Sequence, residues 1–113
     1  MAVFNGIFPC LPGKEAAIKA FASECTGPRR ADFDKMQATG GTSRETWSLQ
    51  QTPMGAFVVV WFEGDPEQAF GELAADQSDF AMWFKAQVKD ISGVDLGAPS
   101  DDPIPETLLD WSA

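Results

Sequence analysis

Residues 44–63, RETWSLQQTPMGAFVVVWFE, decide the fold of this 113-residue chain. From Arg44 to Gln50 apolar and polar side chains alternate, which is typical of a half-buried β-strand. Ala56–Glu63 is rich in β-branched and aromatic residues and predicts a second strand. The turn-forming residues Thr52–Gly55 lie between the two. This stretch therefore predicts a β-hairpin.

The register of the hairpin determines which side chains share a face. A four-residue turn sets Leu49 opposite Val58, and Trp47 then lies opposite Val60. One face of the hairpin is apolar in this register. The other face mixes polar with large apolar side chains, namely Thr46, Ser48, Gln50, Phe57, Val59 and Trp61. A sheet with water on one side alternates apolar with polar residues, so the second strand predicts cover on both faces.

The segments before the hairpin predict one strand and one helix that is broken once. Ala2–Leu11 is an apolar run that ends at a Pro-Gly pair and is short enough for a strand. Thr26-Gly27-Pro28 then divides a helical region that ends at Gly40-Gly41, with Thr26 as a candidate cap and Pro28 suited to a first turn. The first piece has an apolar stripe at helical spacing, formed by Ile18, Phe21, Ala22 and Cys25.

The segments after the hairpin predict a second broken helix and a last strand. Asp65–Gln68 has a cap residue, a first-turn proline and a glutamine placed for a capping box. Ser78 caps another amphipathic helix, which ends near Gly93. Gly97–Pro105 is expected to be irregular. We predict a strand at Glu106–Trp111, because the second helical region otherwise has no strand to follow it.

The predicted order is therefore strand, helix, strand, strand, helix, strand. This is the ferredoxin-like βαββαβ plan of an α+β fold, in which a four-stranded antiparallel sheet carries its helices on one face. The chain length fits a single ferredoxin-like domain over residues 1–113. The open sheet face needs cover, and a second copy facing it in a homodimer with an isologous interface would supply that cover.

Charge and composition exclude several classes of function. The formal net charge is -9 and the pI is near 4.2, so nucleic acid and anionic membrane surfaces are not expected partners. The apolar N-terminus lacks the basic residues of a signal peptide, and no stretch is long enough to span a bilayer. Cys10 and Cys25 lack CxxC spacing and read as reduced, packed thiols, which predicts a cytoplasmic protein.

Motifs for common cofactors are also missing from the sequence. No histidine is present, and no nucleotide-binding, serine-hydrolase or zinc-protease motif occurs, so we expect no metal and no cofactor. A general base working near neutral pH would then have to be a buried carboxylate or a thiolate. Arg44 and Glu45 leave their strand on opposite faces, and we interpret them as edge or interface charges.

Four residues are candidate ligand-binding residues: Asn5, Trp47, Trp61 and Trp83. Asn5 is the only asparagine and lies inside an apolar strand, where an unpaired amide costs on the order of 1–3 kcal/mol. The tryptophans are large and rigid, and each donates one hydrogen bond, which suits an aromatic pocket. The alternative interpretation is that the amide is paired or exposed and that the tryptophans fill the core.

Several segments resemble a bacterial family of uncharacterised proteins in the dimeric α+β barrel superfamily. They are Leu11–Lys14, Arg44–Gly55, Trp83-Phe84 and Gly93–Leu96. The best-known relatives in that superfamily are antibiotic-biosynthesis-type monooxygenases, which this chain is similar to only at the level of the fold. The resemblance implies a dimer with a small-molecule cavity between each sheet and its own helices.

The resemblance carries over little chemistry. Haem-degrading members use a histidine ligand that this chain lacks, and of the residue types that line cofactor-free sites it retains Asn5, its tryptophans and its arginines. The leading expectation is a small dimeric protein that binds a small apolar or aromatic molecule between sheet and helices. The alternatives are a cofactor-independent monooxygenase or isomerase acting on an aromatic metabolite, and a purely structural dimer.

Overall fold

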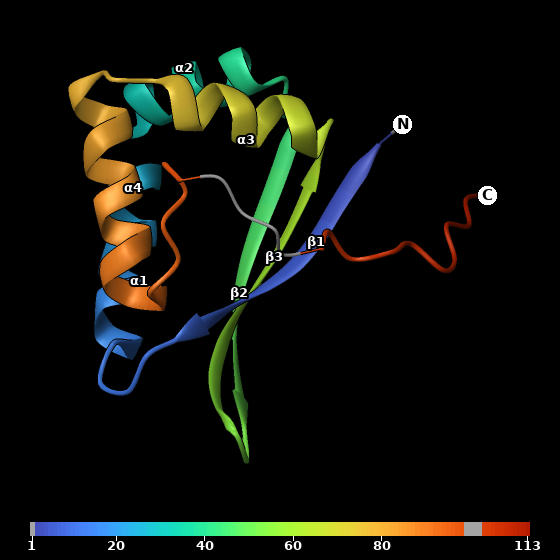
Figure 1. Ribbon diagram of the computed structural model, residues 1–113, viewed down its shortest axis with the longest axis horizontal. Coiled ribbons are helices and arrows are strands. Elements are labelled where there is room, and N and C mark those ends of the chain that lie inside the picture. Colours follow the sequence, from blue (N-terminus) through green and yellow to red (C-terminus); the bar gives the residue numbers. More distant parts are fainter. Residues whose placement is uncertain (1, 99–102) are drawn as a thin grey trace.

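The structure is a computed structural model that describes residues 2–98 and 103–113. Within these residues the chain is α+β, with four helices and one three-stranded antiparallel sheet. Figure 1 shows all the helices on one side of the sheet. The elements in chain order are β1 (Val3–Cys10), α1 (Glu15–Thr26), α2 (Arg30–Gly40), β2 (Arg44–Thr52), β3 (Gly55–Glu63), α3 (Pro66–Ala75) and α4 (Asp79–Ser92).

The sheet has the strand order β1-β3-β2, and the predicted hairpin register is confirmed. Leu49 lies opposite Val58, and Trp47 lies opposite Val60. On its other side β3 pairs with β1 along its length. The central strand is therefore β3, which is hydrogen-bonded along both of its edges. It is also the most apolar of the three strands, as suits a position with a neighbour on each side.

The predicted helix boundaries are confirmed at three of the capping positions. The Asp65 side chain accepts a hydrogen bond from the Glu67 N–H at 3.0 Å, and Ser78 accepts one from the Ala81 N–H at 3.2 Å. Gly93 ends α4 in the left-handed conformation with φ of 80°, which glycine adopts without steric cost. None of the described helices has the length and apolar character needed to cross a membrane.

Two of the predicted capping roles are wrong. Thr26 lies inside α1, and its hydroxyl donates to the Ala22 carbonyl oxygen at 3.0 Å, a bond within the helix that competes with capping. The Gln68 amide does not close a capping box and donates instead to the Thr39 carbonyl oxygen at 3.4 Å. That contact joins α3 to the end of α2, so tertiary packing decides its partner.

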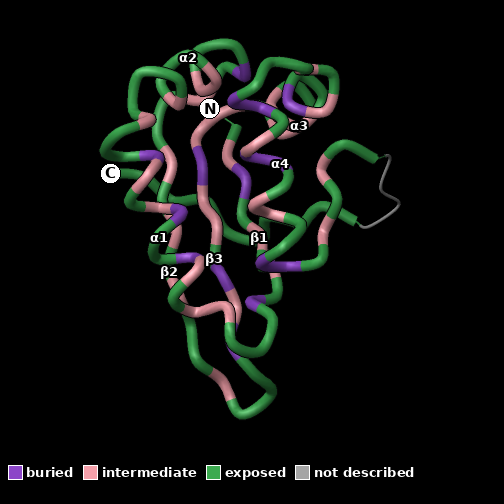
Figure 2. The backbone as a smooth tube through the Cα atoms, turned by 90° about the vertical axis from the view of Figure 1, so that its left-hand side faces the viewer, coloured by how far each residue is buried: buried purple, intermediate pink, exposed green. Residues whose placement is uncertain are grey.

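The hydrophobic core lies between the helices and the inner face of the sheet. Phe21 from α1 is its centre: its ring centroid is 5.2 Å from that of Trp47, 5.4 Å from Trp83 and 5.0 Å from Phe84. Ring pairs at these separations add packing energy beyond burial alone. Figure 2 shows the buried positions on the strands and on the helices that face them, whereas the hairpin tip is exposed.

The predicted fourth strand is not formed. Residues 103–113 contain no regular secondary structure, so the described sheet stops at β1. The side chains of Leu108, Leu109 and Trp111 are 88%, 84% and 77% exposed. Pro103 and Pro105 at the start of this segment have no backbone N–H to give to a ladder. The apolar composition of Glu106–Trp111 was therefore not sufficient to form a strand.

The outer face of the sheet is not covered by helices. Its central row consists of Ile7, Val59 and Ser48, which lie side by side on β1, β3 and β2. Ile7 is 67% exposed and Val59 is 38% exposed. Residues 103–113 run on this side of the sheet, beyond β1 in Figure 1. This face is the one that the sequence predicts to need cover.

Candidate functional site: an aromatic cavity with a partly buried acid

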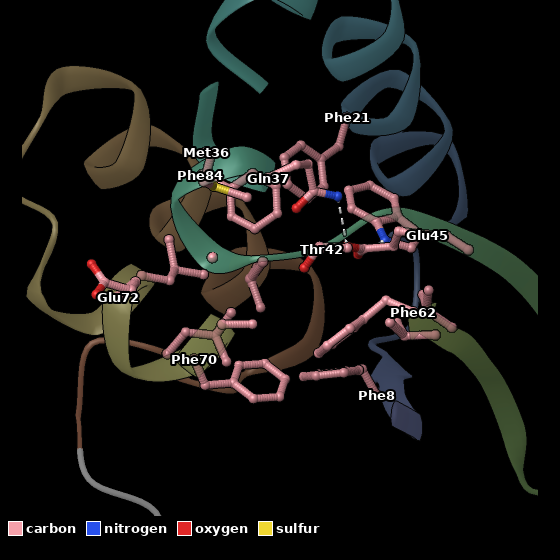
Figure 3. A pocket seen from close by; sticks show the side chains of 18 of the residues that line it. Phe8, Phe21, Met36, Gln37, Thr42, Glu45, Phe62, Phe70, Glu72 and Phe84 are labelled. Carbon is pink, nitrogen blue, oxygen red and sulfur yellow. Dashed lines mark hydrogen bonds between the residues drawn. The ribbon is translucent and has the colours of Figure 1, made fainter. Parts of the chain in front are cut away.

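A cavity of about 100 Å³ lies between the inner face of the sheet and the helices. Every described helix and strand contributes to its wall. Most of the wall is apolar, and its aromatic members are Phe8, Phe21, Trp47, Phe62, Phe70 and Phe84. Figure 3 shows the five phenylalanine rings converging from the strands and the helices. Such a space has the character of a small-molecule site, which is apolar with few polar groups.

The helices above the sheet are held close together at one end of the cavity. Gly40, the last residue of α2, borders the cavity, and a Cβ atom built on it would lie 3.4 Å from the Cα atom of Ala69 in α3. A glycine at this position therefore allows the two helices to approach closely. Gln37, one turn earlier in α2, reaches the sheet, where its amide donates to Glu45.

Glu45 is the polar group on the sheet side of this cavity. One carboxylate oxygen accepts a hydrogen bond from the Gln37 amide at 2.8 Å, and the other accepts one from the Trp47 indole N–H at 2.5 Å. Figure 3 shows the Gln37 amide nitrogen pointing at Glu45. Glu45 and Trp47 are two residues apart on β2, so both project from its inner face. In the described part of the chain, no lysine or arginine forms an ion pair with Glu45.

This environment changes the acidity of Glu45. Burial raises the pKa of its carboxyl above the usual value, and the hydrogen bonds from Gln37 and Trp47 oppose that rise without cancelling it. A carboxyl group with a raised pKa can hold a proton or accept one more readily than a surface acid. It can also pair with a hydrogen-bond donor or a cation on a bound molecule.

We predict that Glu45→Gln changes the pH dependence of stability. Because the pKa of Glu45 is raised on folding, the native state holds this proton more tightly than the unfolded chain does. The unaltered protein therefore loses stability as the pH rises through the pKa that Glu45 has in the folded state. This loss is smallest below the pKa that Glu45 has in the unfolded chain. The variant lacks this loss, so its melting temperature relative to the unaltered protein should increase from acidic to neutral pH.

Parallel thermal melts of the two proteins at several pH values measure this difference. The amide of the variant still accepts one hydrogen bond, and the Gln37 amide can turn to accept the other. A constant difference across the acidic range would contradict the raised pKa.

The two thiols do not supply an alternative base. Cys10 and Cys25 are free and are 4% and 1% exposed. Burial, with Glu45 as the second cause, raises the pKa of Cys25 to about 12, so it carries no thiolate near neutral pH. In the described residues no three cysteine, aspartate or glutamate side chains gather where they could hold a metal ion. The carboxyl of Glu45 is therefore the titratable group of interest.

The structure separates the four predicted site residues into three places. Trp47 borders the cavity. Trp83, on α4, does not line the cavity. It packs edge-on against Phe21, and its ring centroid is 4.0 Å from the guanidinium carbon of Arg29. Asn5 and Trp61 lie directly opposite each other on β1 and β3, and both project from the outer face.

Asn5 and Trp61 border a hollow on the outer side of the sheet. The C-terminal segment forms its other wall through Thr107, Leu109 and Asp110. The Asn5 side chain is exposed there, so its amide can be hydrated. This is the arrangement in which an amide within an apolar strand carries no penalty for burial.

Sequence reasoning missed Glu45 and Gln37. The interpretation of Glu45 as an edge or interface charge is wrong, because its side chain projects from β2 toward the helices. The alternation along β2 contained the signal, since Glu45 is in phase with Trp47 and Leu49. Nothing in the sequence indicated that Gln37 would lie above it.

Comparisons with known proteins add no function to this geometry. Searches of protein-family models, of curated proteins and of solved structures found no match to this chain. The resemblance to the dimeric α+β barrel superfamily stays a prediction. The candidate site consequently rests on the cavity and on the side chains that line it.

Proposed function

We propose that this protein binds a small apolar or aromatic molecule in the cavity between its sheet and its helices. The observation that carries the proposal is the combination of an aromatic wall with a partly buried acid, Glu45, which is held by two neutral donors. Apolar walls supply affinity through burial, and a few placed polar groups orient the ligand.

The size of the cavity limits the ligand to about one ring. An apolar cavity of roughly 150 Å³ in another protein takes up benzene, and the cavity here is about 100 Å³. The cavity here is the smaller of the two, so a single-ring molecule is the upper limit, with its polar end against the Glu45 carboxylate. Benzyl alcohol, which has one ring and a hydroxyl that can donate to a carboxylate, is therefore a suitable first probe.

The test compares two valine substitutions on adjacent residues of β3. Val60 borders the cavity, whereas Val59 projects from the outer face. We expect Val60→Phe to fill part of the cavity and to weaken benzyl alcohol binding by about tenfold or more, which is roughly 1.4 kcal/mol. Val59→Phe makes the same change on the other face and should leave the affinity per chain within about twofold.

Isothermal titration calorimetry of the unaltered chain and both variants measures these affinities. A thermal melt of each protein first confirms that it is folded. Equal affinity in all three proteins would show that the probe does not occupy this cavity, and the proposal would then be wrong.

We also propose that the functional unit is a homodimer formed through the outer sheet face. In the described strands, the rows between the two sheet ends carry no charged side chain on that face, although the chain has a net charge of -9. Two acidic copies can approach where neither presents a charge, and a two-fold axis makes such a face complementary to itself. Residues 103–113, which carry exposed apolar side chains, run on the same side of the sheet and would be buried with it.

A further inference from the structure

The charged side chains that line the cavity all have one sign. Among its described lining residues the charged ones are Glu45, Glu72 and Asp76, and none is a lysine or an arginine. Glu72 is exposed and lies far from Glu45 in the close view of Figure 3. Asp76 accepts hydrogen bonds from Ser78, which lower its pKa and keep it ionised. Lys85 does not line the cavity, but its ammonium group donates to the Asp76 carbonyl oxygen at 2.8 Å and offsets the charge of that residue. A molecule entering the cavity therefore meets acidic side chains and no basic one.

Glu45 is the acid that a ligand in the cavity would contact. Its two hydrogen bonds come from an amide and an indole, which are neutral donors, so its negative charge is not balanced. The described ion pairs are elsewhere, between solvent-exposed side chains. Each carboxylate oxygen can accept a second hydrogen bond, and one to a cation is stronger than one to a neutral group.

The neighbouring rings surround this acid with aromatic carbon. The indole of Trp47 is 5.2 Å from the ring of Phe21 and 6.0 Å from that of Phe84, measured between centroids. The indole N–H lies in the plane of its ring and donates to Glu45, so the carboxylate lies at the edge of Trp47. An ammonium group beside Glu45 would therefore meet the carboxylate, while the attached ring or chain would lie against the apolar wall.

We propose that the cavity selects small hydrophobic amines, whose ammonium group pairs with Glu45 while the ring or chain fills the apolar part. This inference rests on the proposed function and specifies its ligand class. The ammonium group favours the ionised form of Glu45 and removes its unbalanced charge. A carboxylate ligand of the same size is rejected, because it would bring another negative charge into a space already bordered by three acids.

The test uses three single-ring probes that differ mainly in charge: benzylamine, benzyl alcohol and benzoate. Calorimetry with the full chain at neutral pH and physiological ionic strength gives the affinity of each. We expect benzylamine to bind about tenfold more tightly than benzyl alcohol, as one hydrogen bond to a charged group would give. Benzoate should bind more weakly than benzyl alcohol.

Two matched variants separate Glu45 from the general charge of the protein. Glu45→Gln should bring the affinity for benzylamine to within about twofold of that for benzyl alcohol. Glu67→Gln removes the same charge from an exposed residue of α3 outside the cavity and should keep the tenfold preference. If Glu45→Gln does not fold, the ranking of the three probes on the unaltered chain still decides the question.

The outcomes distinguish a failure of amine selectivity from a failure of the proposed ligand binding. If benzyl alcohol binds as tightly as benzylamine, or if Glu67→Gln abolishes the preference as fully as Glu45→Gln does, the amine selectivity is wrong and the cavity remains a binding site. If none of the three probes binds, the proposed function fails and the amine selectivity fails with it.

Discussion

Replacing Ile7 by aspartate is expected to separate the protein into single subunits. Ile7 is 67% exposed in one chain and lies opposite Val59 at the centre of the outer sheet face. A carboxylate there costs a single chain little, because water reaches it. In the proposed dimer it would be buried without a partner, so we expect dimer dissociation constants to rise by about 100-fold or more.

Sedimentation velocity over a range of concentrations measures this effect. Met54→Asp is the matched control, because Met54 is 90% exposed at the tip of the hairpin and receives the same charge outside the face. The control should remain dimeric at the concentrations at which Ile7→Asp does not. At high dilution, where both variants are single subunits, their melting temperatures should be close. An unaltered protein that sediments as a folded monomer at high concentration would end the dimer proposal.

Replacing Phe21 by alanine is expected to produce the largest loss of stability. Phe21 is 3% exposed and its ring contacts three other rings, so its removal leaves a void that the surrounding helices and strands cannot close. Phenylalanine to alanine changes in such cores cost about 3–5 kcal/mol. A domain of this size has a total stability of roughly 5–15 kcal/mol, so the variant would be marginal.

Urea unfolding followed by tryptophan fluorescence gives the free energy of unfolding. If Phe21→Ala is too unstable to measure, Phe21→Leu keeps most of the volume and should cost less, roughly 1–2 kcal/mol. Lys19→Ala, at an exposed residue of the same helix, should change the free energy by no more than about 0.5 kcal/mol. A loss below about 1 kcal/mol for Phe21→Ala would mean that this ring is not central to the core.

The parts of the fold that depend on neighbours in sequence could be predicted. The register of β2 and β3 follows from a short turn and a period of two, both of which are visible in the chain itself. The caps at Asp65 and Ser78 depend on side chains that reach N–H groups two or three residues away. These contacts are local and need no knowledge of the rest of the molecule.

The parts that depend on distant contacts could not be predicted. Glu106–Trp111 resembles a strand in composition, but a strand forms only where another strand offers its hydrogen bonds, and the described chain pairs it with none. The place of Glu45 on the inner face could be read from its phase with Trp47. Its pairing with Gln37 required α2 to fold back over the sheet, and no periodicity contains that information.

The grouping of the tryptophans shows the same limit. Their number indicated an aromatic site, but the sequence did not distinguish the two sheet faces. Trp47 and Trp61 lie on neighbouring strands and project to opposite sides, so only one of them can contact a ligand between sheet and helices. A small-molecule cavity therefore remains a proposal, and of the predicted tryptophans only Trp47 lines it.

A methyl-resolved NMR titration with benzyl alcohol tests most directly whether ligands enter the space between sheet and helices. We expect the methyl signals of four residues that line that space to shift and saturate together, namely Ile18, Val58, Leu73 and Ile91. The signals of Ile7 and Val59, on the other side of the sheet, should stay in place. Saturating shifts confined to Ile7 and Val59, or no shift at any of these residues, would contradict binding between the sheet and the helices.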